Sequence, residues 1–154
     1  MNEMEKDDLR SLDLEELTAY VKKLGEKPFR AKQLWQWIHQ KLALDFEEMT
    51  NLPEGLRKTL KERCALGRMH AVEEQVSRLD GTRKYLFELG AGNVIESVLM
   101  RYHHGISVCI SSQAGCRMGC RFCASAIGGL KRNLTVSEML GHVYGIQRMA
   151  GERE

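Results

Sequence analysis

Proline, aromatic residues and long apolar runs are all scarce in this chain of 154 residues. Its 2 prolines and 14 glycines are too few for a collagenous or low-complexity protein. No apolar run approaches the roughly 18 residues that a membrane-spanning helix needs, so we expect no membrane partner. The acidic N-terminus also lacks the apolar segment of a secretory signal. A globular, cytoplasmic protein is therefore the first expectation.

Acidic residues are absent from one long stretch, residues 97–137. The whole chain has a formal net charge of only +2, which is too mild to indicate a nucleic-acid-binding protein by itself. The acid-free stretch nevertheless holds five basic residues, so it predicts a local electropositive site. Four of the five cysteines lie there: Cys109, Cys116, Cys120 and Cys123. Such crowding in a reducing compartment indicates metal or redox chemistry rather than disulfides.

The first part of the chain, residues 1–65, shows helical signals. Asp13 and Glu16 have the spacing of a capping box at the start of the first helix. A second helix is expected from Arg30 to about Leu42, and a short third helix after Pro53. We expect this part to form a small helical domain.

Aromatic and basic side chains of the second helix allow two interpretations. They could contact RNA through base stacking and phosphate pairing. Alternatively, the tryptophans anchor a core and the basic residues form a solvated face. The residues in question are Trp35, Trp37, Arg30, Lys32 and Lys41. Cys64, which also lies in the helical region, is interpreted as a packing residue.

Short strands are expected in residues 66–104, a linker region with frequent turn signals. Asp80-Gly81-Thr82 is a hairpin signal between the segments VEEQVSRL and KYLFEL. A third strand, from Val94 to Met100, follows a glycine-rich break. Together these elements predict a small antiparallel sheet.

A strand, a loop and a helix are expected in residues 105–154. Alternation in 106–111 places Cys109 on a small polar face of the strand. A long loop is expected from Gln113 to Leu134. A capping box at Thr135 then opens a helix, along which Val136, Met139, Leu140 and Val143 form an apolar stripe.

The predicted fold class is an α+β N-terminal region that leads into a truncated α/β partial TIM barrel. Strand, loop and helix form the first βα unit of such a barrel. One unit cannot close a barrel, so we expect the sequence to be incomplete. We also expect residues 105–154 to expose apolar surface when isolated.

The central motif is Cys116-Arg-Met-Gly-Cys120-Arg-Phe-Cys123, a C-x3-C-x2-C cluster. Three thiolates on one loop can hold three corners of a 4Fe–4S cluster and leave one iron free for a substrate or cofactor. Zinc is an alternative, because it accepts three cysteines and one histidine, and the candidate histidines are His103, His104 and His142. Redox-active or incidental cysteines are the third interpretation.

The cysteine motif, with an aromatic residue before its last cysteine, resembles the signature of the radical S-adenosylmethionine (SAM) superfamily. The wider string CISSQAGCRMGCRFCASAIGGLKRNLTVSEML resembles one branch, the RlmN family of dual-specificity 23S rRNA and tRNA adenine-C2 methyltransferases and their C8-methylating, antibiotic-resistance relatives. KPFRAKQLWQWIHQK is similar to the small helical RNA-binding domain of that branch, and IESVLMRY to its linker into the barrel. The resemblance therefore covers almost the whole chain.

The resemblance implies a role for each site residue. Cys116, Cys120 and Cys123 would hold the 4Fe–4S cluster, with SAM on the fourth iron and Phe122 packed nearby. The family moves a methyl group from SAM to a late cysteine, and from that methyl-cysteine to adenine. Cys109 matches the cysteine that forms a disulfide with the methyl carrier to release the product.

Glu96 matches the family's proton acceptor at the substrate carbon. The residue pattern alone leaves two interpretations open for it: a solvent-facing carboxylate, or one with a raised pKa that suits proton transfer. The resemblance further implies 23S rRNA and tRNA as partners, an electron donor such as flavodoxin, and a monomeric state.

The chain departs from the family pattern after its first βα unit. The Gly-Glu-Pro motif that binds the SAM amino group is missing, and no cysteine follows Cys123. We therefore expect this chain alone to be inactive in methyl transfer. The alternative to an enzyme fragment is a truncated, non-catalytic protein that binds RNA or an iron–sulfur cluster.

Overall fold

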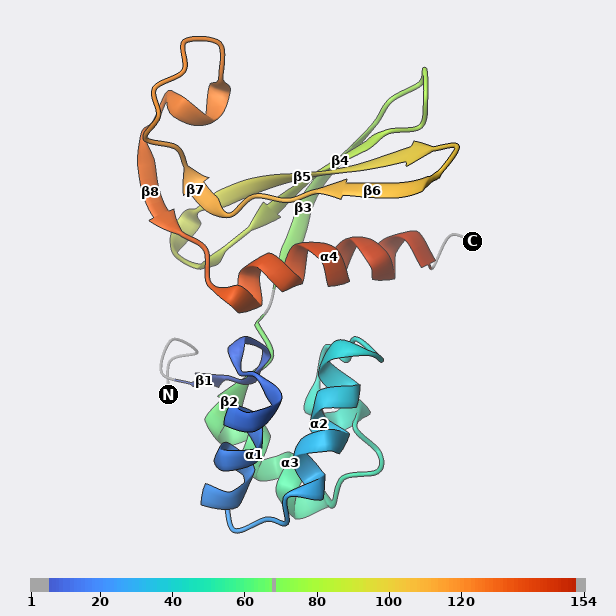
Figure 1. Ribbon diagram of the computed structural model, residues 1–154, viewed down its shortest axis with the longest axis vertical. Helices are drawn as coiled ribbons and strands as arrows, with labels where there is room; N and C mark the ends of the chain where they lie inside the picture. The colour runs from blue at the N-terminus through green and yellow to red at the C-terminus, as the bar shows by residue number, and fades with distance from the viewer. Residues whose placement is uncertain (1–5, 68, 152–154) are drawn as a thin grey trace. The chain divides into compact units, whose positions relative to one another are not determined.

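The computed structural model describes residues 6–67 and 69–151, which form two compact units (Figure 1). The first unit is helical and ends before residue 68. The second unit begins at Met69 and contains a sheet and one long helix. Each unit has its own buried cluster of apolar side chains, so each is described by itself.

Three helices and a short strand pair build the helical unit. The helices are α1 (Leu14–Lys23), α2 (Phe29–His39) and α3 (Glu54–Arg63). Two residues at each end of the unit pair in parallel, β1 (Asp7–Asp8) with β2 (Cys64–Ala65). Single 3-10 turns lie at Leu9–Ser11 and Phe46–Glu48.

Helix α1 begins where the capping box was expected. Asp13 Oδ1 accepts from the backbone N–H of Glu16 at 2.8 Å, and Glu16 Oε2 accepts from the backbone N–H of Asp13 at 2.8 Å. Both contacts satisfy donors that a helix start leaves unpaired. Leu17 and Val21 of this helix are fully buried.

Helices α2 and α3 each start immediately after a proline, which suits the first turn of a helix. Helix α2 ends at His39, earlier than expected, and Leu42 has a left-handed backbone with φ of 55°. The core that these helices enclose includes Leu34, Ile38 and Leu60, whose exposed fractions are all at most 1%. Both tryptophans are half-buried and pack against this core.

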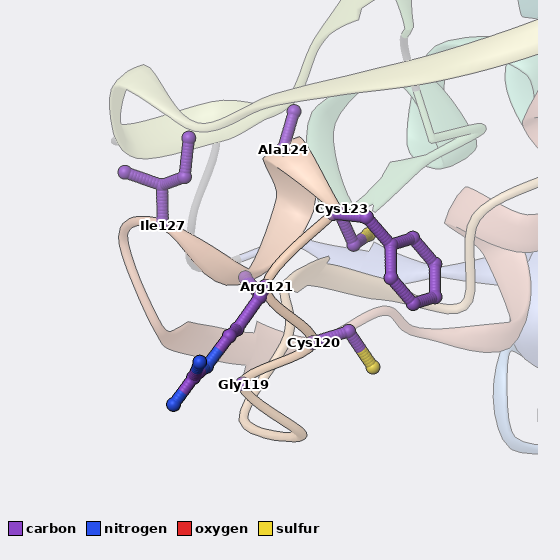
Figure 2. Close-up of a pocket in the computed structure, with 8 residues that line it drawn as sticks. Gly119, Cys120, Arg121, Cys123, Ala124 and Ile127 are labelled. Carbon is purple, nitrogen blue, oxygen red and sulfur yellow. The ribbon is translucent and has the colours of Figure 1, made fainter.

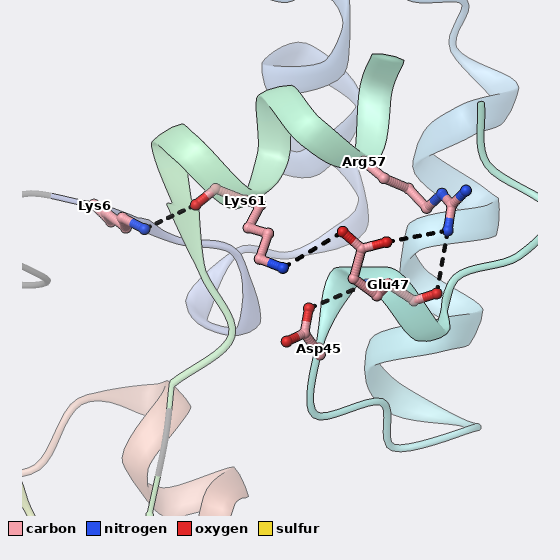
Figure 3. Close-up of polar contacts among 5 residues, drawn as sticks. All are labelled: Lys6, Asp45, Glu47, Arg57 and Lys61. Carbon is pink, nitrogen blue, oxygen red and sulfur yellow. Dashed lines mark hydrogen bonds and ion pairs between the residues drawn. The ribbon is translucent and has the colours of Figure 1, made fainter. Parts of the chain in front are cut away.

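Glu47 joins the loop before α3 to the helix itself (Figure 3). Its carboxylate lies 3.4 Å from Arg57 Nη1 and 3.4 Å from Lys61 Nζ. Asp45 Oδ1 accepts from the backbone N–H of Glu47 at 3.1 Å. Because the Glu47 side chain is more than half exposed, these ion pairs fix geometry and contribute little stability.

The sheet unit is built on four antiparallel strands in the order β3-β4-β5-β6. Their bounds are His70–Val76, Arg83–Glu88, Val94–Tyr102 and Gly105–Cys109. A two-stranded hairpin follows, β7 (Gln113–Gly115) with β8 (Leu130–Asn133), and then helix α4 (Val136–Gly151). The expected small antiparallel sheet is therefore confirmed, with one strand more than expected. No helix of the residues described here combines the length and apolar character needed to cross a membrane.

The two faces of the four-stranded sheet are unlike. One face is covered by α4, and Tyr85, Phe87 and Leu99 are buried there with Ile146 (Figure 1). Alternation along the strands sends their neighbours to the other face. We call this second face, which carries Leu86, Glu96, Val98 and Cys109, the open face.

The strand near Ile106 does not begin a parallel sheet in the described residues. Strand β6 pairs antiparallel with β5 and lies at the sheet edge. The structure thus confirms a mixed α/β unit with antiparallel sheets, but not the barrel. Only His103 and His104 separate β5 from β6, and so short a connection allows an antiparallel hairpin but not a parallel pair.

The expected long loop from Gln113 to Leu134 is wrong in part, because the β7–β8 hairpin closes its base. Gly115 makes this closure possible. Its φ is +75°, and a Cβ atom there would overlap the carbonyl oxygen of Gly129. The cysteine motif is thus carried by a shorter loop that is tied at both ends.

The apolar stripe predicted on the last helix is buried only in part, because Met139 packs against the core of the sheet unit whereas the two valines do not. Val136 is 52% exposed and Val143 is 37% exposed. The buried positions of α4 are instead Ser137, Gly141, His142 and Ile146. The contact of α4 with the sheet thus combines apolar packing by Ile146 with the close approach of Gly145 to Phe87 and the buried hydrogen bond of His142. The capping box is confirmed, since Thr135 and Glu138 exchange both hydrogen bonds.

Candidate functional site

A cavity of about 610 Å³ lies between the open face of the sheet and the base of the cysteine loop. Its lining comes from Leu86 of β4, the start of β5, the end of β6 with the residues after it, and the β7–β8 hairpin with its loop. Among the lining residues, the charged side chains are Glu96 and Lys131, and those with a thiol or hydroxyl are Cys109, Ser111 and Ser125. The fold thus brings two of the predicted site residues, Glu96 and Cys109, to one cavity.

Glu96 projects from the open face of β5. Its side chain is 56% exposed, and its carboxylate lies 3.2 Å from Lys84 Nζ on the neighbouring strand. The hydroxyl of Ser111 donates to the backbone carbonyl of Glu96 at 2.8 Å, which ties the chain after β6 to this position. Of the two interpretations given for Glu96, the structure therefore agrees with a carboxylate that faces solvent.

Cys109 is the last residue of β6 and pairs with Val98 of β5. Val98 lies two residues beyond Glu96, so Cys109 is on the same face of the sheet as Glu96. Its side chain is exposed and its thiol is free. The polar strand face predicted for Cys109 is thus the face that lines the cavity.

The cysteine loop surrounds a second hollow of about 430 Å³ (Figure 2). Cys120 and Cys123 line it together with Arg121 and Phe122. Figure 2 shows the Cys120 sulfur and the Arg121 guanidinium pointing to opposite sides of the loop. Phe122 is 94% exposed, so no part of this chain described here packs over it.

The three loop cysteines are free thiols, and Cys116 Sγ accepts a weak hydrogen bond from the backbone N–H of Met118 at 3.5 Å. Among the described residues, no group of three cysteine, histidine or acidic side chains converges on a common metal position. The donor set nevertheless fits an iron–sulfur cluster. It offers three thiols within eight residues, no competing carboxylate and an accessible hollow beside two of the sulfurs.

The histidines considered for a zinc site lie elsewhere. His142 is fully buried on α4 and hydrogen-bonds to Ser97, on the sheet face opposite to the cavity. His103 and His104 lie at the turn between β5 and β6, where their rings contact each other. The structure therefore brings none of these three histidines to the loop cysteines.

The buried pair of Ser97 and His142 was missed by the sequence analysis. Burial lowers the pKa of His142 to about 4, and its ring meets Phe87 edge-on. In the sequence, Ser97 is one serine in an apolar strand and His142 is one histidine in a helix. Nothing in the sequence alone indicates that the two side chains form a hydrogen bond. The pair fastens α4 to the sheet and lies away from the cavity.

Lys84 and Lys131 were also missed as members of the site. Lys84 contacts Glu96, and Lys131 of β8 lines the cavity. The hairpin register could have found Lys84, because it lies opposite Val98 and therefore on the open face. Lys131 belongs to the acid-free stretch, whose electropositive character the sequence did predict.

The fold and the cysteine loop together place the chain in a class of known enzymes. The structure matches the crystal structure of a radical SAM methyltransferase from Sphaerobacter thermophilus with a TM-score of 0.87 at 41% identity. The match covers 96% of this chain and 43% of that chain. The class is thus the radical SAM methyltransferases, which implies SAM and an iron–sulfur cluster as cofactors.

Two further comparisons identify the family. Residues 7–66 match the family described as the ribosomal RNA large subunit methyltransferase N-terminal domain. The chain is 61% identical over 149 residues to a probable dual-specificity RNA methyltransferase RlmN from Lachnoclostridium phytofermentans, and 58% identical over 146 residues to one from Lachnospira eligens. The chain belongs to the RlmN family. The two matches cover 97% and 95% of this chain, respectively, but only 42% of the length of each relative.

Proposed function

We propose that this chain is the N-terminal part of an enzyme that methylates C2 of an adenine in 23S rRNA, with tRNA as a second substrate. The observation that carries the proposal is the shared cavity. Glu96 and Cys109 both line it, and it adjoins the loop that holds the three remaining site cysteines. The rest of the partial barrel and the methyl-carrying cysteine belong to the part of the enzyme outside this sequence.

Cys116, Cys120 and Cys123 are the residues that would hold a 4Fe–4S cluster, with SAM on the iron that no cysteine ligates. When bound, these cofactors supply one-electron reduction and the methyl group. Phe122 would cover the bound cofactors, because its exposed ring borders the hollow beside Cys120 and Cys123. Arg117 and Arg121, both exposed, would offset the negative charge of thiolates and sulfides.

Glu96 would accept the proton that leaves C2 when the new carbon–carbon bond is complete. The carboxylate is accessible from the cavity, as a base that touches substrate must be. Lys84 would position this carboxylate through their 3.2 Å ion pair, and the Ser111 hydrogen bond would fix the backbone beneath it.

Cys109 would release the product: its thiolate would attack the sulfur of the methyl-carrying cysteine, so that a disulfide forms as the bond from that sulfur to the adenine-bound carbon breaks, and the carbon would take a proton to become the methyl group. Its exposed position at the end of β6 leaves the thiol free to meet a second cysteine at the cavity. Thiol–disulfide exchange requires this kind of access. An electron donor such as flavodoxin, a monomeric state and a cytoplasmic setting complete the proposal.

The helical unit would contact the RNA. Lys41 Nζ lies 3.8 Å from the centroid of the Trp37 ring, and the Trp37 indole N–H donates to Asn51 Oδ1 at 2.6 Å. Arg30 lies over the exposed ring of Phe29 at 4.6 Å. These half-exposed aromatic and cationic groups fit the stacking and phosphate contacts through which proteins recognise RNA.

Mutations at Cys109 and Glu96 in the full-length enzyme test the proposal. With RNA, SAM and a reductant, Cys109→Ala should accumulate RNA covalently attached to protein, seen as a slow band on a denaturing gel. Cys64→Ala is the matched control, because Cys64 is buried in the helical unit, and it should give no such band. Glu96→Gln should lower turnover by about a hundredfold or more, as loss of a general base does. Normal turnover without an adduct in Cys109→Ala would overturn the role of Cys109, and unchanged turnover in Glu96→Gln that of Glu96.

A further inference from the structure

The turn between β5 and β6 presents an exposed stack of rings. Tyr102 and His104 are stacked, with ring centroids 5.1 Å apart and planes within 8° of parallel. His103 meets His104 edge-on at 5.2 Å. Tyr102 is 51% exposed, and both histidines are exposed as well. The turn therefore offers a rigid aromatic surface to solvent rather than to a core.

This ring stack belongs to the same sheet face as the cavity. Tyr102 lies six residues after Glu96 on β5, an even separation that places both on the open face. The Tyr102 hydroxyl reaches Met100 Sδ at 3.3 Å, which keeps the ring along that face. At about 3.3 Å per residue the two positions are roughly 20 Å apart. Figure 1 shows the β5–β6 turn at the end of the sheet away from the cysteine loop.

No acidic side chain lies in the sequence around the turn, so no like charge there opposes a polyanion such as RNA. The turn belongs to the acid-free stretch, residues 97–137, and Arg101 lies beside it on the opposite face of β5. The β3–β4 turn of the same sheet provides a contrast. There Arg78 and the acidic Asp80 flank Leu79, which is 99% exposed, and the turn holds no aromatic residue.

We propose that the ring stack of Tyr102 and His104 binds an unpaired base of the RNA substrate by stacking. The inference rests on the proposed function, because it takes RNA as the partner. Stacking on aromatic and histidine rings is a general way in which proteins hold bases that are not paired in a duplex. A second base contact roughly 20 Å from Glu96 would orient the RNA along the open face of β5 while the target adenine occupies the cavity.

Equilibrium binding of the 154-residue chain to a fluorescent single-stranded RNA tests this proposal. Tyr102→Ala and His104→Ala should each raise Kd about fivefold or more, the effect expected from losing one base–aromatic stack. Tyr102→Phe should stay within about twofold of the unmodified chain, because its ring still stacks. The matched control is Leu79→Ala at the other turn, which should leave Kd unchanged.

Two further readouts separate stacking from other roles of the turn. The slope of log Kd against log salt should be the same for Tyr102→Ala and the unmodified chain, because no phosphate contact is lost. Binding to a fully paired duplex should not change, because its bases are not available for stacking.

Equal Kd values for the unmodified chain and Tyr102→Ala would overturn the inference and leave the proposed function standing. The same holds if Tyr102→Phe is as weak as Tyr102→Ala, or if duplex binding falls equally. Absence of RNA binding by the unmodified chain would instead count against RNA as the partner, and the inference would fall with it.

Discussion

The helical unit and the sheet unit use their apolar residues in opposite ways. In the helical unit, side chains from α1, α2 and α3 point to one enclosed core. In the sheet unit, only the α4 side of the sheet is buried, and the open face carries Glu96, Cys109 and the cavity. Because side chains alternate along a strand, every second residue of β5 packs in the core under α4, and the residues between them lie on the open face, where Glu96 lines the cavity.

The cysteines show the same contrast, and their reactivity gives the largest expected difference. Cys64 is 2% exposed, burial raises the pKa of its thiol, and it lies 3.2 Å from the Tyr20 hydroxyl. Because thiol reagents attack the accessible thiolate, Cys64 should react about a thousandfold or more slowly than Cys109. Timed alkylation with mass spectrometry would measure both rates.

Denaturant provides the control for this experiment, because Cys64 should become as reactive as Cys109 once the helical unit unfolds. Comparable rates for the two thiols in the folded protein would show that the helical core is not enclosed as described.

Removing a core side chain should destabilise one unit and spare the other. Leu34 is fully buried among the helices, so Leu34→Ala should lower the free energy of unfolding of the helical unit by about 2–5 kcal/mol. Both tryptophans of the chain, Trp35 and Trp37, lie in α2, so tryptophan fluorescence in urea reports this unit alone. Leu79→Ala, at a 99% exposed position of the sheet unit, is the control. A shift of less than about 1 kcal/mol in Leu34→Ala would contradict the enclosed core.

Acid should weaken the sheet unit through His142. Burial lowers its pKa from 6.5 to about 4, so between these values the unfolded chain holds a proton that the folded unit does not. Stability is then complete above pH 6.5 and falls with pH by up to about 1.4 kcal/mol per unit until pH reaches about 4. Urea titrations followed by circular dichroism would measure the slope. His142→Gln should flatten it, and an equal slope in that variant would rule out His142 as the cause.

Elements defined by local hydrogen bonds could be predicted from the sequence. The capping boxes at Asp13 and Thr135 and the hairpin turn at Asp80 are formed as expected, because each rests on side chains within a few residues of one another. The open-face position of Cys109 was also accessible, since strand alternation alone separates it from Val108.

Features that depend on distant partners could not be predicted. The antiparallel pairing of β6 with β5 is not one of them, because the two-residue connection of His103 and His104 is a local hairpin signal that the expectation of a barrel strand overlooked. The hydrogen bond of His142 to Ser97 and the close approach of Gly145 to Phe87 are such features, because each joins α4 to a strand about 50 residues earlier. The ion pair of Lys84 with Glu96 likewise becomes visible only once the strand register is known.

Anaerobic reconstitution of the chain with iron and sulfide tests the cysteine loop most directly. We expect a sulfide-dependent absorbance, about four irons per chain and an electron paramagnetic resonance signal that SAM changes. Cys120→Ala should lose all three signals, whereas Cys64→Ala, in the enclosed helical core, should keep them. Stoichiometric zinc without sulfide uptake, or iron binding that survives Cys120→Ala, would contradict the assignment of this loop to an iron–sulfur cluster.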